Sequence, residues 1–395
     1  MSLQTWLVSL LLLICVILCW SVSAQAFAPY PYDSYYSGAR FRRGPLMGFD
    51  GEDTQLQQLM QNLKPRPTLL IRIASSLGCI AHIHMATAGE IVEVNWLAGH
   101  INDPHVKVLD ATYEVKPKPN WEEFKNTSYG KFDELIKTHA NPNYTAEHIP
   151  NAVHFNLDVA YFPGQYERFS FYSPELFEQY VQKLGINKDD KLIVYSRGPA
   201  AGMLFAARVW WTFRVYGHHN IEVLNGGFNA WKSAGHPTKS GDKNVTQGNW
   251  KAGPIDKSLY ANFDDLTNDP RGGNLFENKM SAINMLDARP GGQFNGSEPL
   301  GFPAPKATGS HVAGAKNVPL PNVVGETGVK DKSALEEALK KAGFDASKPT
   351  VTMCNSGVQA SMLALGLARL GIKARVYNGS MSELALRASE YINSK

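Results

Sequence analysis

The residues best suited to chemistry form one short segment near the carboxyl end, Cys354-Asn-Ser-Gly-Val-Gln-Ala360. An apolar run typical of a buried strand precedes the cysteine, and an apolar helix is expected to begin just after the glycine. The unpaired N–H groups and the dipole at a helix start stabilise an anion. We therefore expect Cys354 to ionise, because the thiolate is the nucleophilic form. The same amide groups could hold the terminal sulfur of a persulfide, which is also anionic.

Cys354 could instead be an inert packed thiol or half of a disulfide. A lone cysteine is often a small core residue, but a position between a strand end and a helix start favours the nucleophile. A disulfide with Cys79 is the alternative for a chain of the secretory pathway. Cys79 falls outside the repeated part of the chain, which argues against that pairing.

The elements that must position Cys354 occur twice along the chain. Gly185 precedes Ser196 by the same interval that separates Gly343 from Cys354, so Ser196 and Cys354 are expected at equivalent strand ends. Helices are expected to begin at Ser173, as a cap before a proline, and at Ser333, as a capping box. The predicted pairs of strands are 106–112 and 283–289, 191–195 and 350–353, and 221–224 and 374–377, with helices over 200–216 and 358–370.

This alternation predicts an α/β fold of two tandem domains, each a parallel sheet flanked by helices, with the ligand at the carboxyl ends of the strands. We expect the domains at 90–235 and 275–393. Residues 236–274 are rich in Pro, Gly, Lys and Asp and are expected to form the linker. No Gly-x-Ser-x-Gly motif surrounds Ser196, so the first domain is expected to be a structural wall and only the second to be catalytic.

The amino end has the composition of a targeting segment. Residues 1–24 contain no Asp, Glu, Lys or Arg, and Val22-Ser-Ala24 fits a cleavage site, which predicts a signal peptide and a secreted protein. The apolar run could instead stay uncleaved as a membrane anchor. Residues 25–89 form a lead segment without an assigned role. The sequons are at Asn126, Asn143, Asn244, Asn295 and Asn378; we expect Asn378 to stay unmodified, because it follows a strand that faces the proposed site.

Several function classes find no support in the sequence. The 39 basic and 36 acidic residues leave a net charge of +3, so no nucleic-acid partner is expected, and a membrane only if the leader is retained. The sequence has no group of Cys and His residues that would predict a metal site, and it has no nucleotide-binding glycine motif. We therefore expect no cofactor. A cysteine phosphatase needs an arginine where this chain has Ala360.

These segments resemble a tandem-domain rhodanese, most closely the branch of 3-mercaptopyruvate and thiosulfate sulfurtransferases. The loop of 3-mercaptopyruvate sulfurtransferases reads Cys-Gly-Ser-Gly-Val-Thr-Ala, against Cys-Asn-Ser-Gly-Val-Gln-Ala here. The resemblance covers roughly residues 90–390. Other shared segments are Trp96-Leu-Ala, His148-Ile-Pro, Arg208-Val-Trp-Trp211, Asn225-Gly-Gly-Phe228 and Trp231.

The resemblance implies sulfur transfer through a Cys354 persulfide, from a small sulfur donor such as thiosulfate or 3-mercaptopyruvate to a thiol or cyanide acceptor. It implies catalytic roles for Cys354, Ser356 and Asp158. It further implies that the donor is bound by Arg289, Asn355, Gly357, Val358 and Gln359.

Departures from the family pattern favour weaker binding of anionic donors. Phe169 occupies the position of the family's relay histidine, and Gln293 occupies the position of one donor-binding arginine. A second donor-binding arginine of the family has no counterpart near Phe302. Each lost charged hydrogen bond weakens binding by roughly 1.5–3 kcal/mol. The family's Asp-Gly-Ser-Trp segment is Asn378-Gly-Ser-Met here. The alternative is therefore a secreted rhodanese-like binding or scaffold protein with little turnover.

Overall fold

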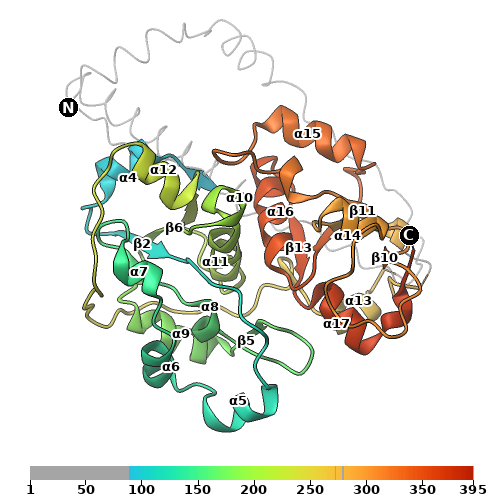
Figure 1. The fold of residues 1–395 in the computed structure, drawn as a ribbon, viewed down its shortest axis with the longest axis horizontal. Coiled ribbons are helices and arrows are strands. Elements are labelled where there is room, and N and C mark those ends of the chain that lie inside the picture. Colours follow the sequence, from blue (N-terminus) through green and yellow to red (C-terminus); the bar gives the residue numbers. More distant parts are fainter. Residues whose placement is uncertain (1–88, 272, 278–279, 395) are drawn as a thin grey trace, which may run out of the picture. The chain divides into compact units, whose positions relative to one another are not determined.

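The computed structural model describes residues 89–271, 273–277 and 280–394 (Figure 1). The predicted leader 1–24, almost all of the lead segment 25–89 and Cys79 lie outside the described residues. Among the helices of the described part, none is long and apolar enough to cross a membrane.

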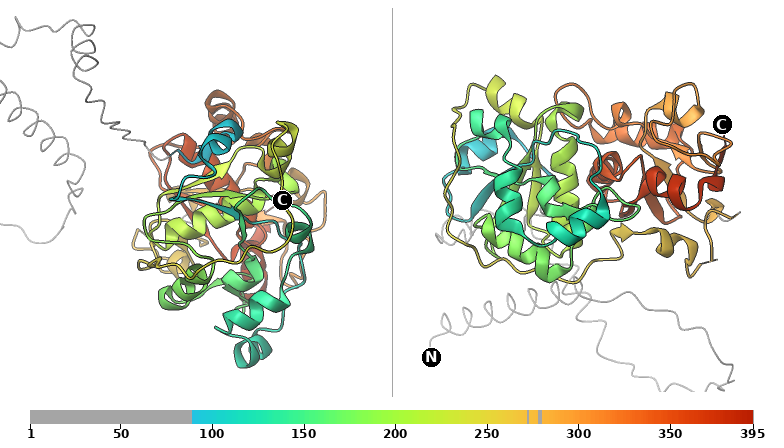
Figure 2. Two further views of the ribbon diagram at one scale, coloured as in Figure 1. Left: turned by 90° about the vertical axis from the view of Figure 1, so that its left-hand side faces the viewer. Right: turned by 60° about the horizontal axis from the view of Figure 1, so that its bottom comes forward.

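A five-stranded parallel sheet forms the first repeat, drawn in cyan to yellow-green in Figures 1 and 2. Its strands are short and almost wholly buried, as expected where helices flank a parallel sheet. In spatial order the strands are β1 (Ile91–Val92), β7 (Ile221–Leu224), β6 (Lys191–Tyr195), β2 (Val106–Asp110) and β3 (Val153–His154).

A second five-stranded parallel sheet repeats this topology. Its middle strand carries Cys354 at its end, as β6 carries Ser196, which confirms the predicted equivalence of the two residues. In spatial order the strands are β8 (Tyr260–Ala261), β13 (Ala374–Tyr377), β12 (Thr350–Met353), β9 (Asn284–Asp287) and β11 (Lys316–Asn317). Two antiparallel ribbons are added by β4 (Tyr161–Phe162) with β5 (Ser170–Phe171) and by β10 (His311–Val312) with β14 (Ile392–Ser394).

Part of the predicted linker belongs to the second sheet. Tyr260–Ala261 pairs with the end of β13, in the place that β1 takes in the first sheet. A strand of two residues gives no periodic signal, so the stretch 236–274 looked like an irregular connection. The second repeat therefore gains its edge strand from before residue 275.

Helices connect the strands in both repeats. Figure 1 labels them, and Figure 2 shows their packing from two other directions. In the first repeat they are α4 (Val94–His100), α5 (Trp121–Thr127), α6 (Phe132–Thr138), α7 (Pro142–Ala146), α8 (Leu157–Ala160), α9 (Pro174–Lys183), α10 (Pro199–Gly202), α11 (Leu204–Val215) and α12 (Gly227–Ser233). After it come α13 (Phe263–Thr267), α14 (Gly291–Asn295), α15 (Lys332–Lys341), α16 (Val358–Arg369) and α17 (Ser380–Arg387), with short 3₁₀ turns at Met280–Ala282, Leu320–Asn322 and Ser389–Tyr391.

Helix starts differ from expectation in two places. Ser173 caps α9 as predicted, whereas α15 is capped by Asp331, whose Oδ1 accepts the N–H of Ala334 at 2.8 Å. The carboxylate two residues earlier replaces Ser333 because it is a stronger acceptor at the positive end of a helix. The helix expected over 200–216 begins only at Leu204, since Ala200 and Ala201 adopt left-handed backbone angles.

The long helices α11 and α16 join the two repeats. They pack against each other, and one hydrophobic cluster includes buried side chains of both, such as Trp211 and Leu363. In chain order α11 follows the middle strand β6 of the first sheet, with α10 between them, and α16 follows the middle strand β12 of the second sheet. The α11–α16 contact therefore links the Ser196 segment of the first repeat to the Cys354 segment of the second.

Candidate active site

The backbone of Cys354 is held by the start of α17. The Cys354 N–H donates to Ser380 Oγ at 3.1 Å, and the Cys354 carbonyl accepts the N–H of Met381 at 3.0 Å. The next carbonyl, of Asn355, accepts the N–H of Ser382 at 2.9 Å. Ser380 takes a left-handed φ of 52°, which is unusual for a side chain other than glycine and brings its hydroxyl beneath Cys354. The loop thus starts from a fixed position.

Amide groups of the following turn surround the cysteine sulfur. The N–H of Gly357 donates to Cys354 Sγ at 3.1 Å, and α16 begins at Val358. Gly357 has a φ of 82°, which a residue with a side chain rarely adopts. A Cβ at this position would lie 2.7 Å from the Asn378 carbonyl and 2.9 Å from Arg208 Nη1, so only glycine fits. The sequence expectation of an amide cradle is confirmed.

The ionisation state of Cys354 differs from the expectation. Complete burial raises the pKa of the thiol above its ordinary value of 9.0, and it outweighs the amides of Ala360, Ser356 and Gly357, which lower the pKa. The nearby Asp287 carboxylate raises it further. The helix start provides the donors that we predicted, but desolvation of the sulfur is the larger effect. Burial therefore opposes the ionisation of Cys354 that the sequence predicts, and the surrounding amides favour it.

A buried arginine of the first repeat reaches the Cys354 loop. Arg208 on α11 is 0% exposed, and its Nη2 donates to Asn378 Oδ1 at 2.6 Å. Its Nη1 lies 3.4 Å from the Gly357 carbonyl, and its Nε donates to Tyr161 Oη at 3.1 Å. None of these partners is a carboxylate. The first repeat thus supplies a buried cation that fixes the strand-to-helix turn following β13 next to Gly357.

A cavity of about 520 Å³ opens beside this loop, at the carboxyl ends of strands from both repeats. Gln359, in the first turn of α16, lines it, and so does Ala288, whose N–H donates to the carbonyl of Met353 at 2.8 Å. Cys354 itself is 1% exposed and is not among the residues that line the cavity. The remaining lining comes from Pro199, Ala200, Ala201, Pro290, Gly291, Pro319, Leu320, Pro321, Val324, Gly325 and Glu326.

The predicted loop residues are brought together. Asn355 Nδ2 donates to Gln293 Oε1 at 3.2 Å, and Asn355 Oδ1 is buried without a partner among the described residues. Ser356 contributes its backbone amide to the sulfur. Val358 is buried at the start of α16, and Gln359 faces the cavity. These residues lie in the turn after Cys354 and at the start of α16, and their roles in catalysis and donor binding stay predictions.

Arg289 does not line the cavity. Its guanidinium is 0% exposed and pairs with Asp287 at 2.6 Å, and it also donates to the Ser310 carbonyl at 3.0 Å. Nη1 of Arg289 has no partner within the described part of the chain. Because Asp287 neutralises it, the charge of Arg289 is already committed within the second sheet.

Asp158 lies on α8, and both of its hydrogen-bond donors belong to the first repeat. Its Oδ1 accepts from Arg168 Nη2 at 2.7 Å and from Tyr113 Oη at 3.0 Å. Both Asp158 and Arg168 line a separate cavity of about 250 Å³. The structure therefore does not place Asp158 in the wall of the cavity beside Cys354, and its catalytic role stays a prediction.

Sequence reasoning gave no role to Arg208, Ser380 or the apolar wall of the cavity. The Arg208-Val-Trp-Trp segment was the one signal available for Arg208, as part of the family resemblance. Asn378 is 2% exposed, and its Nδ2 donates to the Phe169 carbonyl at 2.9 Å. Its predicted lack of glycosylation stays a prediction.

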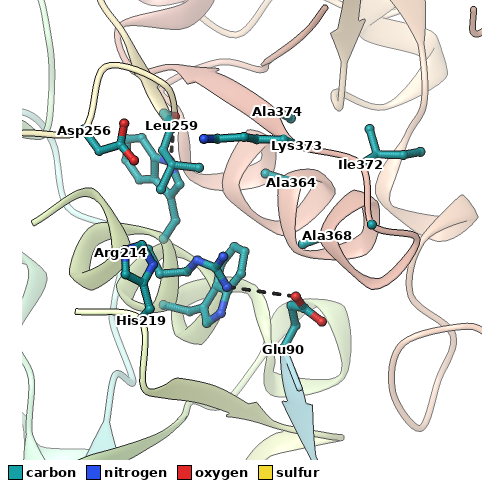
Figure 3. Close-up of a pocket in the computed structure, with 13 residues that line it drawn as sticks. Glu90, Arg214, His219, Asp256, Leu259, Ala364, Ala368, Ile372, Lys373 and Ala374 are labelled. Carbon is teal, nitrogen blue, oxygen red and sulfur yellow. Dashed lines mark hydrogen bonds and ion pairs between the residues drawn. The ribbon is translucent and has the colours of Figure 1, made fainter. Parts of the chain in front are cut away.

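A second cavity, of about 280 Å³, lies between the later turns of α11 and α16, away from their starts (Figure 3). Arg214 stacks over the ring of Trp210 and lies 4.0 Å from Glu90, and Lys373 also lines the cavity. No cysteine lines it, and the described residues contain no cluster of three metal-ligating side chains. This cavity lies apart from the Cys354 loop, because none of the loop residues lines it.

Comparisons with known proteins match this arrangement. The model of the rhodanese-like domain matches residues 93–234 and 274–386. A protein of Caenorhabditis elegans named as a putative thiosulfate sulfurtransferase is 37% identical over 316 residues, which cover 77% of this chain and 95% of that protein. The 3-mercaptopyruvate sulfurtransferase of Escherichia coli is 28% identical over 298 residues, which cover 75% of this chain and 95% of the relative.

Solved structures agree with the sequence relatives. The crystal structure of the 3-mercaptopyruvate sulfurtransferase SseA from Escherichia coli superimposes with a TM-score of 0.56 at 25% identity, covering 74% of this chain and 99% of that one. Tum1 from Saccharomyces cerevisiae, at 22% identity, shares the fold with a TM-score of 0.60 over 78% of this chain and 98% of its own. The chain therefore belongs to the rhodanese-like family, as a tandem-domain member near the thiosulfate and 3-mercaptopyruvate sulfurtransferases.

Proposed function

We propose that this chain transfers a sulfane sulfur through a persulfide on Cys354. The observation that carries the proposal is the single free thiol of the described residues, which is cradled by helix-start amides beside a cavity. Sulfur transfer is the activity named for its relatives. Amide donors aimed at the sulfur can stabilise the negative charge of a persulfide as well as that of a thiolate.

The first half-reaction moves one sulfur atom to Cys354. With thiosulfate, Cys354 Sγ bonds to the outer sulfur, the S–S bond of the donor breaks, and sulfite leaves with the bonding electrons. The thiol proton ends on the leaving group, so Cys-SH and thiosulfate give Cys-S-S⁻ and hydrogen sulfite. With 3-mercaptopyruvate the C–S bond breaks instead, and the leaving carbon takes a proton to give pyruvate.

The second half-reaction removes the terminal sulfur. A thiol gives a new persulfide and cyanide gives thiocyanate, and in both cases Cys354 returns as the acceptor attacks the terminal sulfur. No cofactor or metal is needed for either step, because the electrons move within the breaking and forming sulfur bonds.

Thiocyanate formation from a sulfane donor and cyanide tests the proposal. Wild-type protein should turn over, and Cys354→Ser should be inactive. Ser196→Ala is the matched control, because Ser196 occupies the equivalent strand end and its hydroxyl only bonds the Gly202 carbonyl at 2.8 Å and the Ala206 N–H at 3.3 Å. Turnover that persists in Cys354→Ser would reject sulfur transfer through Cys354. No turnover in the wild type would favour the binding-protein alternative.

A further inference from the structure

We propose that Cys354 accepts sulfur from organic donors whose body, beyond the reacting sulfur, is apolar and uncharged, and that the dianion thiosulfate is a poor donor. This inference rests on the proposed sulfurtransferase function and specifies its donor class. It comes from the walls of the 520 Å³ cavity.

The cavity wall is built almost wholly from apolar side chains and backbone. Apart from Glu326 and Gln359, every lining residue is Pro, Ala, Gly, Leu or Val. They come from three loops, one in the first repeat and two in the second. Its volume falls in the range of about 300–1,000 Å³ that suits organic ligands. An apolar group would lose its hydration there at no electrostatic cost.

No cation lines this cavity among the described residues. Glu326 is the one ionisable side chain in the wall, and it is exposed at the rim. A second negative charge on a donor would leave water without meeting a counter-charge, which is strongly unfavourable. The sulfur anion alone is provided for, by the amides around Cys354.

Two buried arginines near the Cys354 loop already have partners within the protein. Arg289 pairs with Asp287 at 2.6 Å, and Arg208 donates to Asn378 Oδ1 at 2.6 Å. Neither arginine lines the cavity. Both guanidinium groups therefore make hydrogen bonds within the protein and lie outside the wall that a donor would meet.

Two strained alanines keep the wall apolar. Ala200 and Ala201 both have a φ of 53°, in the left-handed region that favours glycine. Such a conformation is costly for a residue that carries a Cβ, and it is characteristic of functional sites. Glycine would relieve the strain but remove both methyl groups from the wall.

A matched donor series separates charge from apolar contact. Thiosulfate, methanethiosulfonate and benzenethiosulfonate all transfer their outer sulfur. Cys-SH and R-SO₂-S⁻ give Cys-S-S⁻ and R-SO₂H: the new S–S bond forms at Cys354, and the sulfinate leaves with the electrons of the broken bond and the thiol proton. The first replacement changes O⁻ to CH₃, and the second changes CH₃ to a phenyl ring.

Stopped-flow or quenched-flow formation of the Cys354 persulfide should be measured for each donor. Each rate constant is divided by that of the same donor with 2-mercaptoethanol, which removes intrinsic reactivity. We expect the normalised rate constant to rise at each step by about tenfold or more. A value for thiosulfate equal to or above that for benzenethiosulfonate would overturn the inferred donor class. No persulfide from any donor would instead overturn the proposed function.

Cations placed in the wall should reverse the preference. Glu326→Lys at the rim and Gln359→Lys inside should raise the normalised rate with thiosulfate by about fivefold or more at low ionic strength, and less at high salt. The gain with benzenethiosulfonate should be smaller, because it carries one negative charge where thiosulfate carries two. Glu122→Lys, on exposed α5, makes the same charge change as Glu326→Lys outside the cavity and should leave all three rates unchanged. An equal gain in that control would contradict the cavity argument.

Discussion

The contact between Arg208 and Asn378 joins the two repeats and should be measurable as a coupling energy. Arg208→Met removes the guanidinium from a site that is 0% exposed. It leaves Asn378 Oδ1 without the donor that now lies at 2.6 Å. An unsatisfied buried acceptor costs about 1–3 kcal/mol, and the weaker bonds to Tyr161 and Gly357 add to this. We expect Arg208→Met to lower the free energy of unfolding by about 2–4 kcal/mol.

A double-mutant cycle isolates the contact. Arg208→Met, Asn378→Ala and the double variant are unfolded in urea and followed by the fluorescence of the eight tryptophans. The double variant should lose about 1.5–3 kcal/mol less stability than the sum of the two single losses, because each single variant already breaks the same charged hydrogen bond. Lys188, whose side chain is 61% exposed, gives the control pair: Arg208→Met and Lys188→Ala should be additive within about 0.5 kcal/mol.

The same variants connect stability to chemistry. Because Arg208 lies against Gly357, the Arg208→Met and Asn378→Ala variants should both slow uptake of sulfur by Cys354, even where the protein remains folded. Coupling below about 0.5 kcal/mol would refute the claim that this contact links the repeats. Normal sulfur uptake in a folded Arg208→Met would refute its role in positioning the loop.

Three further predictions concern single residues. Burial, and to a lesser extent the Glu167 carboxylate, raises the pKa of Glu383 from 4.5 to about 7. The folded protein therefore holds a proton that the unfolded chain releases, and stability should fall as the pH rises from 4.5 to about 7. Glu383→Gln should flatten that slope in urea unfolding and raise stability at pH 8 by up to about 3 kcal/mol, and an unchanged slope would count against this explanation. Gly357→Ala should cost about 1–3 kcal/mol and slow alkylation or sulfur uptake at Cys354, because its Cβ meets the Asn378 carbonyl; full activity with unchanged stability would contradict the tight turn. Alkylation of Cys354 by iodoacetamide, followed by peptide mass spectrometry across pH, should show a midpoint above that of an ordinary thiol, and a midpoint below it would show that the amides outweigh burial.

The sheet and its duplication could be predicted because their signals are local. The middle strand Lys191–Tyr195 and its counterpart Thr350–Met353 are apolar runs that end at equivalent residues, and the structure has them with the predicted bounds. The fixed glycine spacing then aligns the two repeats. Strand Tyr260–Ala261 was missed because two residues within a polar stretch carry no pattern, and only pairing with β13 defines it.

Only the part of the site that consecutive residues form could be predicted from the sequence. The amides of the Gly357 turn follow from a strand, a glycine and a helix in succession, which the sequence displays. The pKa of Cys354 depends on complete burial, which is a tertiary property and reversed the expected direction. The hydrogen bond from Arg208 to Asn378 spans 170 positions of the chain, and no spacing rule predicts it.

The specificity of the site also depends on packing. The left-handed Ala200 and Ala201 violate local preference, and the apolar pattern of the sequence predicts a helix there. Their methyl groups become part of the cavity only when the first repeat meets the second. The family resemblance suggested that Arg289 binds the donor, whereas the structure shows its guanidinium paired with the Asp287 carboxylate.

Peptide mass spectrometry of Cys354 after brief exposure to a thiosulfonate donor would detect the persulfide itself, on which the proposed chemistry depends. We expect the Cys354 peptide to gain the mass of one sulfur atom, cyanide to remove that sulfur, and Cys354→Ser to gain nothing. A wild-type peptide that stays unmodified with every donor, in protein shown to be folded, would contradict sulfur transfer through Cys354.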